Sequence, residues 1–106
     1  MSRRPIFTVL KDIQEFSPVN GDWRRLDALL DELWSEGVSQ GSLPILFSLF
    51  ERFPAEDGDG VLWSIVNGIE SQSFDYERAL RQSLQRQSSL MGRIMLQRLE
   101  KAKERT

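Results

Sequence analysis

Carboxylates are the most concentrated chemically active side chains in this sequence of 106 residues. Between residues 22 and 60, nine acidic residues stand against three basic ones, a local charge of −6, while the whole chain carries −2. Histidine and cysteine, which supply most general bases, thiol nucleophiles and zinc ligands, are both absent from the sequence. The carboxylates that remain are suited to recognising a positively charged partner. We therefore predict a protein that is not an enzyme and needs no metal or cofactor.

Two acidic pairs lie four positions apart in the segment predicted to form the second helix: Asp27 with Asp31, and Glu32 with Glu36. Like charges at this spacing are neighbours on a helix and cost an isolated helix roughly 0.2–0.5 kcal/mol per pair. Glu32 and Glu36 also lie toward the negative end of the helix dipole. A sequence tuned only for stability would place lysine there, so the pattern favours an acidic surface that faces a basic partner.

A solvated helix face, partly neutralised by Arg24 and Arg25, is the simpler interpretation of these charges. A second acidic stretch, residues 56–60, follows further along the chain with sequence EDGDG. It lacks the spacing and closing glutamate of an EF-hand calcium loop. We predict a loop in which Asp59 caps the following helix, and which adjoins the end of the second helix.

The candidate partner-binding residues combine these carboxylates with one tryptophan. Trp34 lies at the edge of its apolar stripe, and tryptophan is favoured as an interface anchor. The full set is Asp27, Asp31, Glu32, Trp34, Glu36, Glu56, Asp57 and Asp59.

Apolar residues at helical spacing predict an all-α single domain over residues 1–106, with six helices and no strands. The helices are expected near residues 5–16, 23–36, 43–53, 61–71, 76–84 and 89–102. Short connections imply antiparallel neighbours, grouped as three αα-hairpins in a HEAT-like helical repeat or a compact bundle. Residues 61–69 are apolar around most of the helix circumference, so we expect them to form the central, buried helix.

Asn67 and Glu70 interrupt that apolar helix and share a face, because they are three residues apart. They are either buried, hydrogen-bonded groups or part of a groove. A carboxylate without a second positioned catalytic group makes a poor active site.

The remaining charges and apolar runs predict where the protein is found and what it does not bind. No apolar run reaches the length of a membrane-spanning helix, and Lys11 and Asp12 end the apolar start of the chain without a cleavage site. We therefore predict a cytoplasmic protein with no membrane partner.

The basic residues after residue 60 are spread over two helices without exposed aromatics, so nucleic-acid binding is not expected. Both a monomer and a dimer fit the apolar faces.

Residues 61–70 (VLWSIVNGIE), Tyr76 and residues 91–99 resemble small all-helical immunity proteins of bacterial polymorphic toxin and contact-dependent inhibition systems. The later segment contains Met-Leu-x-Arg as residues 95–98, and Asn67 stands where that group is expected to have histidine. The resemblance implies a protein that binds one cognate toxin domain, often a nuclease, and blocks it. The alternative is a helical-repeat adaptor or regulatory subunit that binds a peptide or a partner helix.

Overall fold

Six α-helices and one short 3-10 helix make up most of residues 5–72 and 74–104, the part of the chain described by this computed structural model. In chain order the elements are α1 (Ile6–Glu15), α2 (Arg24–Glu36), η1 (Gln40–Ser42), α3 (Leu43–Arg52), α4 (Val61–Glu70), α5 (Glu77–Arg86) and α6 (Leu90–Glu104). These residues contain no strand, only a single bridge between Val19 and Asp22. The predicted all-α fold with six helices is confirmed.

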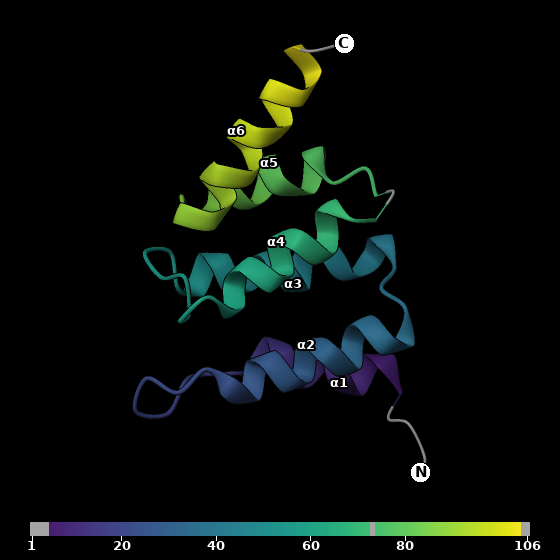
Figure 1. The fold of residues 1–106 in the computed structure, drawn as a ribbon, viewed down its shortest axis with the longest axis vertical. Coiled ribbons are helices and arrows are strands. Elements are labelled where there is room, and N and C mark those ends of the chain that lie inside the picture. The colour runs from purple at the N-terminus through teal and green to yellow at the C-terminus, as the bar shows by residue number, and fades with distance from the viewer. Residues whose placement is uncertain (1–4, 73, 105–106) are drawn as a thin grey trace.

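The helices are arranged as three pairs stacked along the long axis: α1 with α2, α3 with α4, and α5 with α6 (Figure 1). On one side of the stack α3 is the close neighbour of α1 and α5, and on the other α4 is the close neighbour of α2 and α6. The odd and even helices thus form two layers, and the molecule measures 45 × 30 × 21 Å. None of the described helices is both long enough and apolar enough to cross a bilayer.

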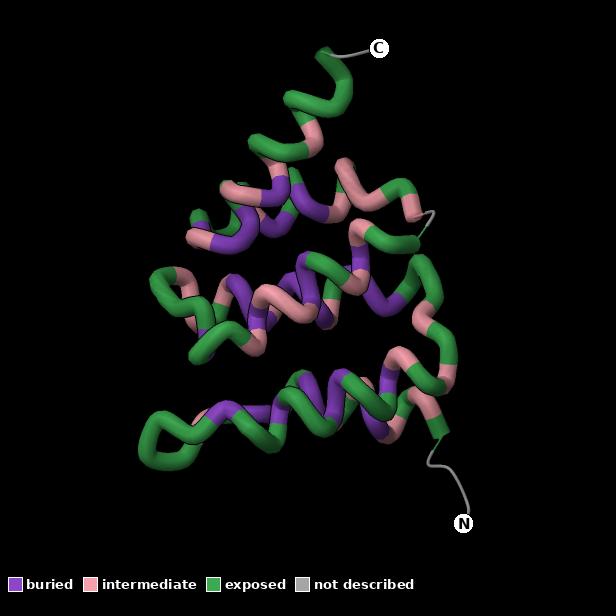
Figure 2. Tube along the Cα trace, in the orientation of Figure 1, coloured by how far each residue is buried: buried purple, intermediate pink, exposed green. Residues whose placement is uncertain are grey.

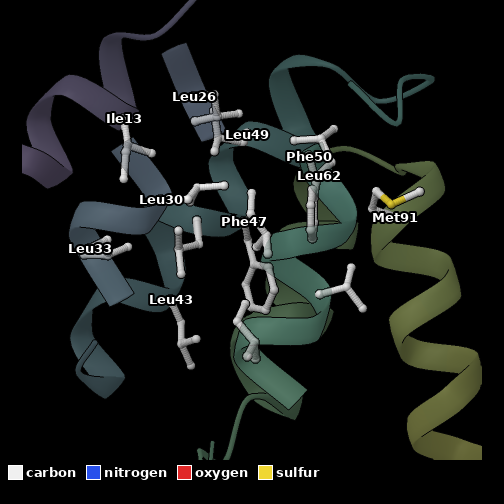
Figure 3. Close-up of a cluster of buried hydrophobic side chains, with 14 of the residues drawn as sticks. Ile13, Leu26, Leu30, Leu33, Leu43, Phe47, Leu49, Phe50, Leu62 and Met91 are labelled. Atoms are coloured by element: carbon white, nitrogen blue, oxygen red, sulfur yellow. The ribbon is translucent and has the colours of Figure 1, made fainter. Parts of the chain in front are cut away.

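The hydrophobic core lies between the two layers, and α3 and α4 occupy its centre (Figure 2). In α4 only Asn67 is exposed, and four of its side chains are fully buried. This agrees with the expected central helix at residues 61–69. Two phenylalanines of α3, Phe47 and Phe50, pack with ring centroids 5.8 Å apart and face core residues of the neighbouring helices (Figure 3).

Local sequence explains several of the observed helix ends. The Asn20-Gly21 turn has both residues at positive φ, 53° and 74°, as a type I′ turn requires. The Ser89 hydroxyl accepts a hydrogen bond from the Gly92 backbone N–H at 3.1 Å, so this serine caps the start of α6. Ser89 is itself buried.

The predicted cap of α4 is wrong. Gly60, and not Asp59, occupies the capping position, and no side chain there accepts a helix N–H. The backbone at Gly60 has φ of 89°, a left-handed conformation that favours glycine. The chain reaches α4 through turns in which the Asp57 carbonyl accepts the Leu62 N–H at 3.1 Å. A backbone carbonyl therefore accepts the helix N–H that the Asp59 carboxylate was expected to accept.

Arg52, at the end of α3, ties that helix to the C-terminal end of α1. Its guanidinium donates hydrogen bonds to the carbonyls of Phe16 at 2.7 Å and Ile13 at 3.2 Å. It also lies over the ring of Phe53, 5.2 Å from the centroid. Carbonyls at a helix C-terminus lack helical partners and carry partial negative charge, which suits a cation.

Glu51 makes the corresponding link between α3 and α5. Its carboxylate accepts hydrogen bonds from Ser83 Oγ at 2.8 Å and from Arg86 Nε at 2.9 Å. Burial opposes ionisation of Glu51, but the hydrogen bonds from Arg86 and Ser83 outweigh it and hold its pKa below the usual value.

Candidate protein-binding surface

The contact between α2 and α4 is built on a tryptophan and a glycine. Trp34 is half-buried near the end of α2, and its ring covers Gly68 of α4. A Cβ atom added to Gly68 would lie 2.3 Å from the ring, so only glycine fits beneath it. This contact identifies the flank of α2 that faces α4.

Asp27 and Asp31 lie on this same flank of α2. Asp31 precedes Trp34 by three positions and Asp27 precedes Asp31 by four, the spacings that align side chains along a helix. Both aspartates are exposed. The structure therefore brings two of the predicted carboxylates together with the predicted tryptophan beside α4.

Glu32 and Glu36 lie on the opposite flank, which faces α1. Glu32 follows Arg25 by seven positions and so shares its stripe. Arg25 reaches across to α1, where its Nη2 is 3.8 Å from Asp12 Oδ2. Glu32 and Glu36 both have interaction partners of their own. The predicted acidic surface is thus two surfaces, and these two glutamates do not belong with Asp27 and Asp31.

The arginines at the start of α2 pair with carboxylates outside that helix, which corrects the expected neutralisation of its own acids. Arg24 Nη2 lies 2.8 Å from Asp22 Oδ2, and the Asp22 carboxylate also accepts the Arg24 backbone N–H at 3.0 Å. These hydrogen bonds lower the pKa of Asp22 to about 2. The capping position itself is held by Trp23.

The acidic loop between α3 and α4 lies at the beginning of α2, and not at its end as predicted. A Cβ atom on Gly58 would lie 2.9 Å from the indole of Trp23, the residue that precedes α2. Trp23 is one helical turn before Asp27, so the loop continues the same flank. We call this surface the acidic strip; it consists of Glu56, Asp57, Asp59, Asp27, Asp31 and Trp34.

The five carboxylates of the acidic strip are exposed. Within residues 5–72 and 74–104, no ion pair or side-chain hydrogen bond reaches any of them. Four basic side chains of the C-terminal helices pair with other carboxylates: Arg86 with Glu51, Arg98 with Glu70, and both Arg81 and Lys103 with Glu77. The same described residues contain no group of three or more side chains able to hold a metal ion.

A hollow of about 440 Å³ opens where the acidic strip meets the last turns of α4. It is lined by Asp31, Trp34, Ser64, Asn67, Gly68, Ser71 and Gln72. The lining contains one carboxylate, one indole, two amides and no basic side chain. Of the two polar residues noted on the apolar helix, Asn67 is exposed beside the hollow, while Glu70 is half-buried on the side of α6.

The role of Gly68 was not predicted from the sequence. The available signal was a glycine inside an otherwise apolar helix, where it costs about 1 kcal/mol relative to alanine and therefore points to a close packing contact. The indole that covers it lies 34 positions earlier in the chain, and nothing local pairs the two residues.

The fold and the surface together define a small two-layer stack of helical pairs with an acidic strip along one contact between pairs. Comparison of the chain with protein-family models, with curated proteins and with solved structures found no significant match.

Proposed function

We propose that this protein is an immunity protein that binds a cognate bacterial toxin domain in the cytoplasm and neutralises it through the acidic strip. The observation that carries the proposal is the row of exposed carboxylates beside α4, which pair with no described side chain. The resemblance of residues 61–70 and 91–99 to small helical immunity proteins supports the same role.

Charge explains how such a strip blocks a toxin. A nuclease holds the phosphates of its substrate in a basic groove, and a row of carboxylates presents similar negative charge to that groove. Long-range attraction between opposite charges also raises the association rate, which favours capture of the toxin before it acts. Trp34 adds a large half-buried aromatic surface at one end of this charged region, the type of residue that anchors interfaces.

Two charge-matched variants test this proposal. Asp27→Asn with Asp31→Asn, and Glu32→Gln with Glu36→Gln, each remove two negative charges from α2, the first pair on the flank toward α4 and the second on the flank toward α1. Each variant is co-expressed with the toxin-like product of a neighbouring reading frame, and growth is measured. We expect the aspartate variant to lose protection, with Kd raised by about tenfold or more, and the glutamate variant to protect.

Circular dichroism on both variants verifies that the helices persist. Equal protection by the two variants, or loss of protection only in the glutamate variant, contradicts the acidic-strip mechanism. Growth that is never rescued by the unchanged protein contradicts the proposed pairing with that toxin.

A second candidate function is a helical adaptor that binds a peptide or a partner helix. It is favoured by a hollow of about 590 Å³ along the outward side of α6, where Leu90, Ile94 and Leu96 are half-buried among charged residues. Binding through such apolar area tolerates salt, whereas binding through the acidic strip weakens as charges are screened. The Kd of the complex measured from about 0.05 to 0.5 M salt separates the two functions.

A further inference from the structure

We propose that the hollow beside Trp34 binds an arginine side chain of the partner. The inference rests on the proposed function and names the chemistry by which the acidic strip recognises its partner. The guanidinium is expected to pair with the Asp31 carboxylate and to stack on the Trp34 indole.

The lining of the hollow selects a cation over an anion or a neutral group. Asp31 contributes a full negative charge, and the amides of Asn67 and Gln72 contribute oxygen acceptors. The hollow also lies at the C-terminal end of α4, where the helix dipole is negative. None of the lining residues is basic, so no side chain of the lining neutralises Asp31.

The planar indole selects arginine over lysine. Guanidinium is flat, weakly hydrated and able to stack on an aromatic face while it donates two parallel hydrogen bonds to a carboxylate. An ammonium group is compact and strongly hydrated, so it gains less from the same ring. The contact between Trp34 and Gly68 fixes the indole in place, which reduces the entropy cost of binding.

The molecule already contains one site of this kind, at Arg52. Its guanidinium lies over the Phe53 ring at 5.2 Å from the centroid and donates to two carbonyls at the C-terminal end of α1. Aromatic ring, helix C-terminus and guanidinium are thus combined inside the chain. The hollow presents the same kinds of group, an aromatic ring and a helix C-terminus, together with a carboxylate.

The test uses N-acetyl-L-arginine amide as the probe and follows the Trp34 indole N–H by NMR, with the signal assigned through Trp34→Phe. N-acetyl-L-citrulline amide, which has the same shape without the charge, is the matched control ligand. We expect a saturable shift of the Trp34 signal with the arginine probe, a weak response to N-acetyl-L-lysine amide and none to the citrulline probe. Asp31→Asn is expected to lower the affinity for the arginine probe about tenfold, and Glu32→Gln to leave it unchanged.

Equal shifts with the arginine and citrulline probes, an undiminished shift in Asp31→Asn, or no shift at about 0.1 M probe would each overturn the arginine site. The titration contains no toxin, so its failure is separable from failure of the proposed function. If growth protection persists while the titration fails, the arginine site is wrong and the immunity role stands. If the titration succeeds while the unchanged protein never rescues growth, the arginine site stands and the immunity role is wrong.

Discussion

The two flanks of α4 face neighbouring helices in the same layer, but the acidic side chains at these two contacts are paired differently. Toward α6, Glu70 is half-buried and its Oε1 lies 2.9 Å from Arg98 Nη2. Tyr76 lies near this pair: burial raises the pKa of its hydroxyl, and the negative charge of Glu70 raises it further. The flank toward α6 therefore contains both members of its ion pair within the chain.

Toward α2, the contact contains a carboxylate without a cation. Trp34 covers Gly68, and Asp31 lines a hollow whose other residues are neutral. Each flank thus has one acidic residue beside a half-buried aromatic side chain. Among the described residues, only the flank toward α6 also has a basic side chain that pairs with this acidic residue. The difference separates carboxylates that are paired within the fold from carboxylates that face outward, and the surface proposed to bind a partner belongs to the second group.

The largest effect is expected from filling the space under Trp34. Gly68→Val places two methyl groups where even a Cβ would lie 2.3 Å from the indole, so the ring must leave its site. We expect the free energy of unfolding to fall by about 2–3 kcal/mol, measured by urea denaturation. Asn67→Val introduces the same residue at an exposed position of the same helix and is expected to change stability by less than about 0.5 kcal/mol.

The cost of Gly68→Val should largely disappear when Trp34→Ala removes the ring. Such coupling in a double-mutant cycle identifies the indole as the cause. If Gly68→Val costs as much without the ring as with it, the valine is unfavourable for reasons intrinsic to α4, and the contact does not define the flank toward α2.

Glu51→Gln tests a carboxylate that is fully engaged within the fold. The variant loses its charged hydrogen bonds from Arg86, and we expect a loss of about 1 kcal/mol at pH 7. The pKa of Glu51 in the folded protein lies below its ordinary value of 4.5. Its contribution is therefore present above pH 4.5 and disappears as the pH falls through the folded pKa.

Urea denaturation of both proteins at several pH values gives the measurement. The stability difference between the unchanged protein and Glu51→Gln should shrink steadily below pH 4.5. A difference that stays constant down to pH 2.5 would mean that Glu51 stabilises the fold by packing and not as a charge.

A smaller effect compares the two flanks directly. Glu70→Gln breaks the ion pair with Arg98, which is half exposed, so we expect a loss of only about 0.5 kcal/mol. Asp31→Asn breaks no ion pair to a described residue and should cost nothing. Chemical denaturation of the two single variants under one condition measures the contrast. Equal losses would show that the flanks do not differ in how they use their carboxylates.

The helices were predictable from sequence because their signals are local. The spacing of apolar residues within each segment and the Asn20-Gly21 turn depend only on neighbours in the chain. The two-layer stacking was one of two arrangements that fit the same apolar faces. Local sequence does not distinguish them, because each face is satisfied by any apolar neighbour of suitable shape.

The candidate site was predictable only in its residue types. The acidic composition of α2 points to Asp27 and Asp31, but it does not separate them from Glu32 and Glu36, because all four belong to one helix. Their separation depends on which flank of α2 faces α4, and that is decided by a contact between residues 34 positions apart. The loop at residues 56–60 was placed at the wrong end of α2 for the same reason: its neighbour, Trp23, is distant in sequence.

The smallest predicted effect is the change in stability when the repulsion between Asp27 and Asp31 is removed, and its sign tests whether these carboxylates support the fold. Asp27 and Asp31 are four residues apart on an exposed flank, so their repulsion opposes the helix by roughly 0.2–0.5 kcal/mol. Asp31→Asn should therefore stabilise the isolated protein slightly while it weakens the proposed toxin complex, because it removes the repulsion and keeps Asp27 in the first turn of α2, where the helix dipole favours a carboxylate. Thermal denaturation of the free variant, with the unchanged protein as the reference, measures the gain. A variant that is less stable than the unchanged protein would mean that these carboxylates support the fold, and the case for an outward-facing acidic strip would lose its physical basis.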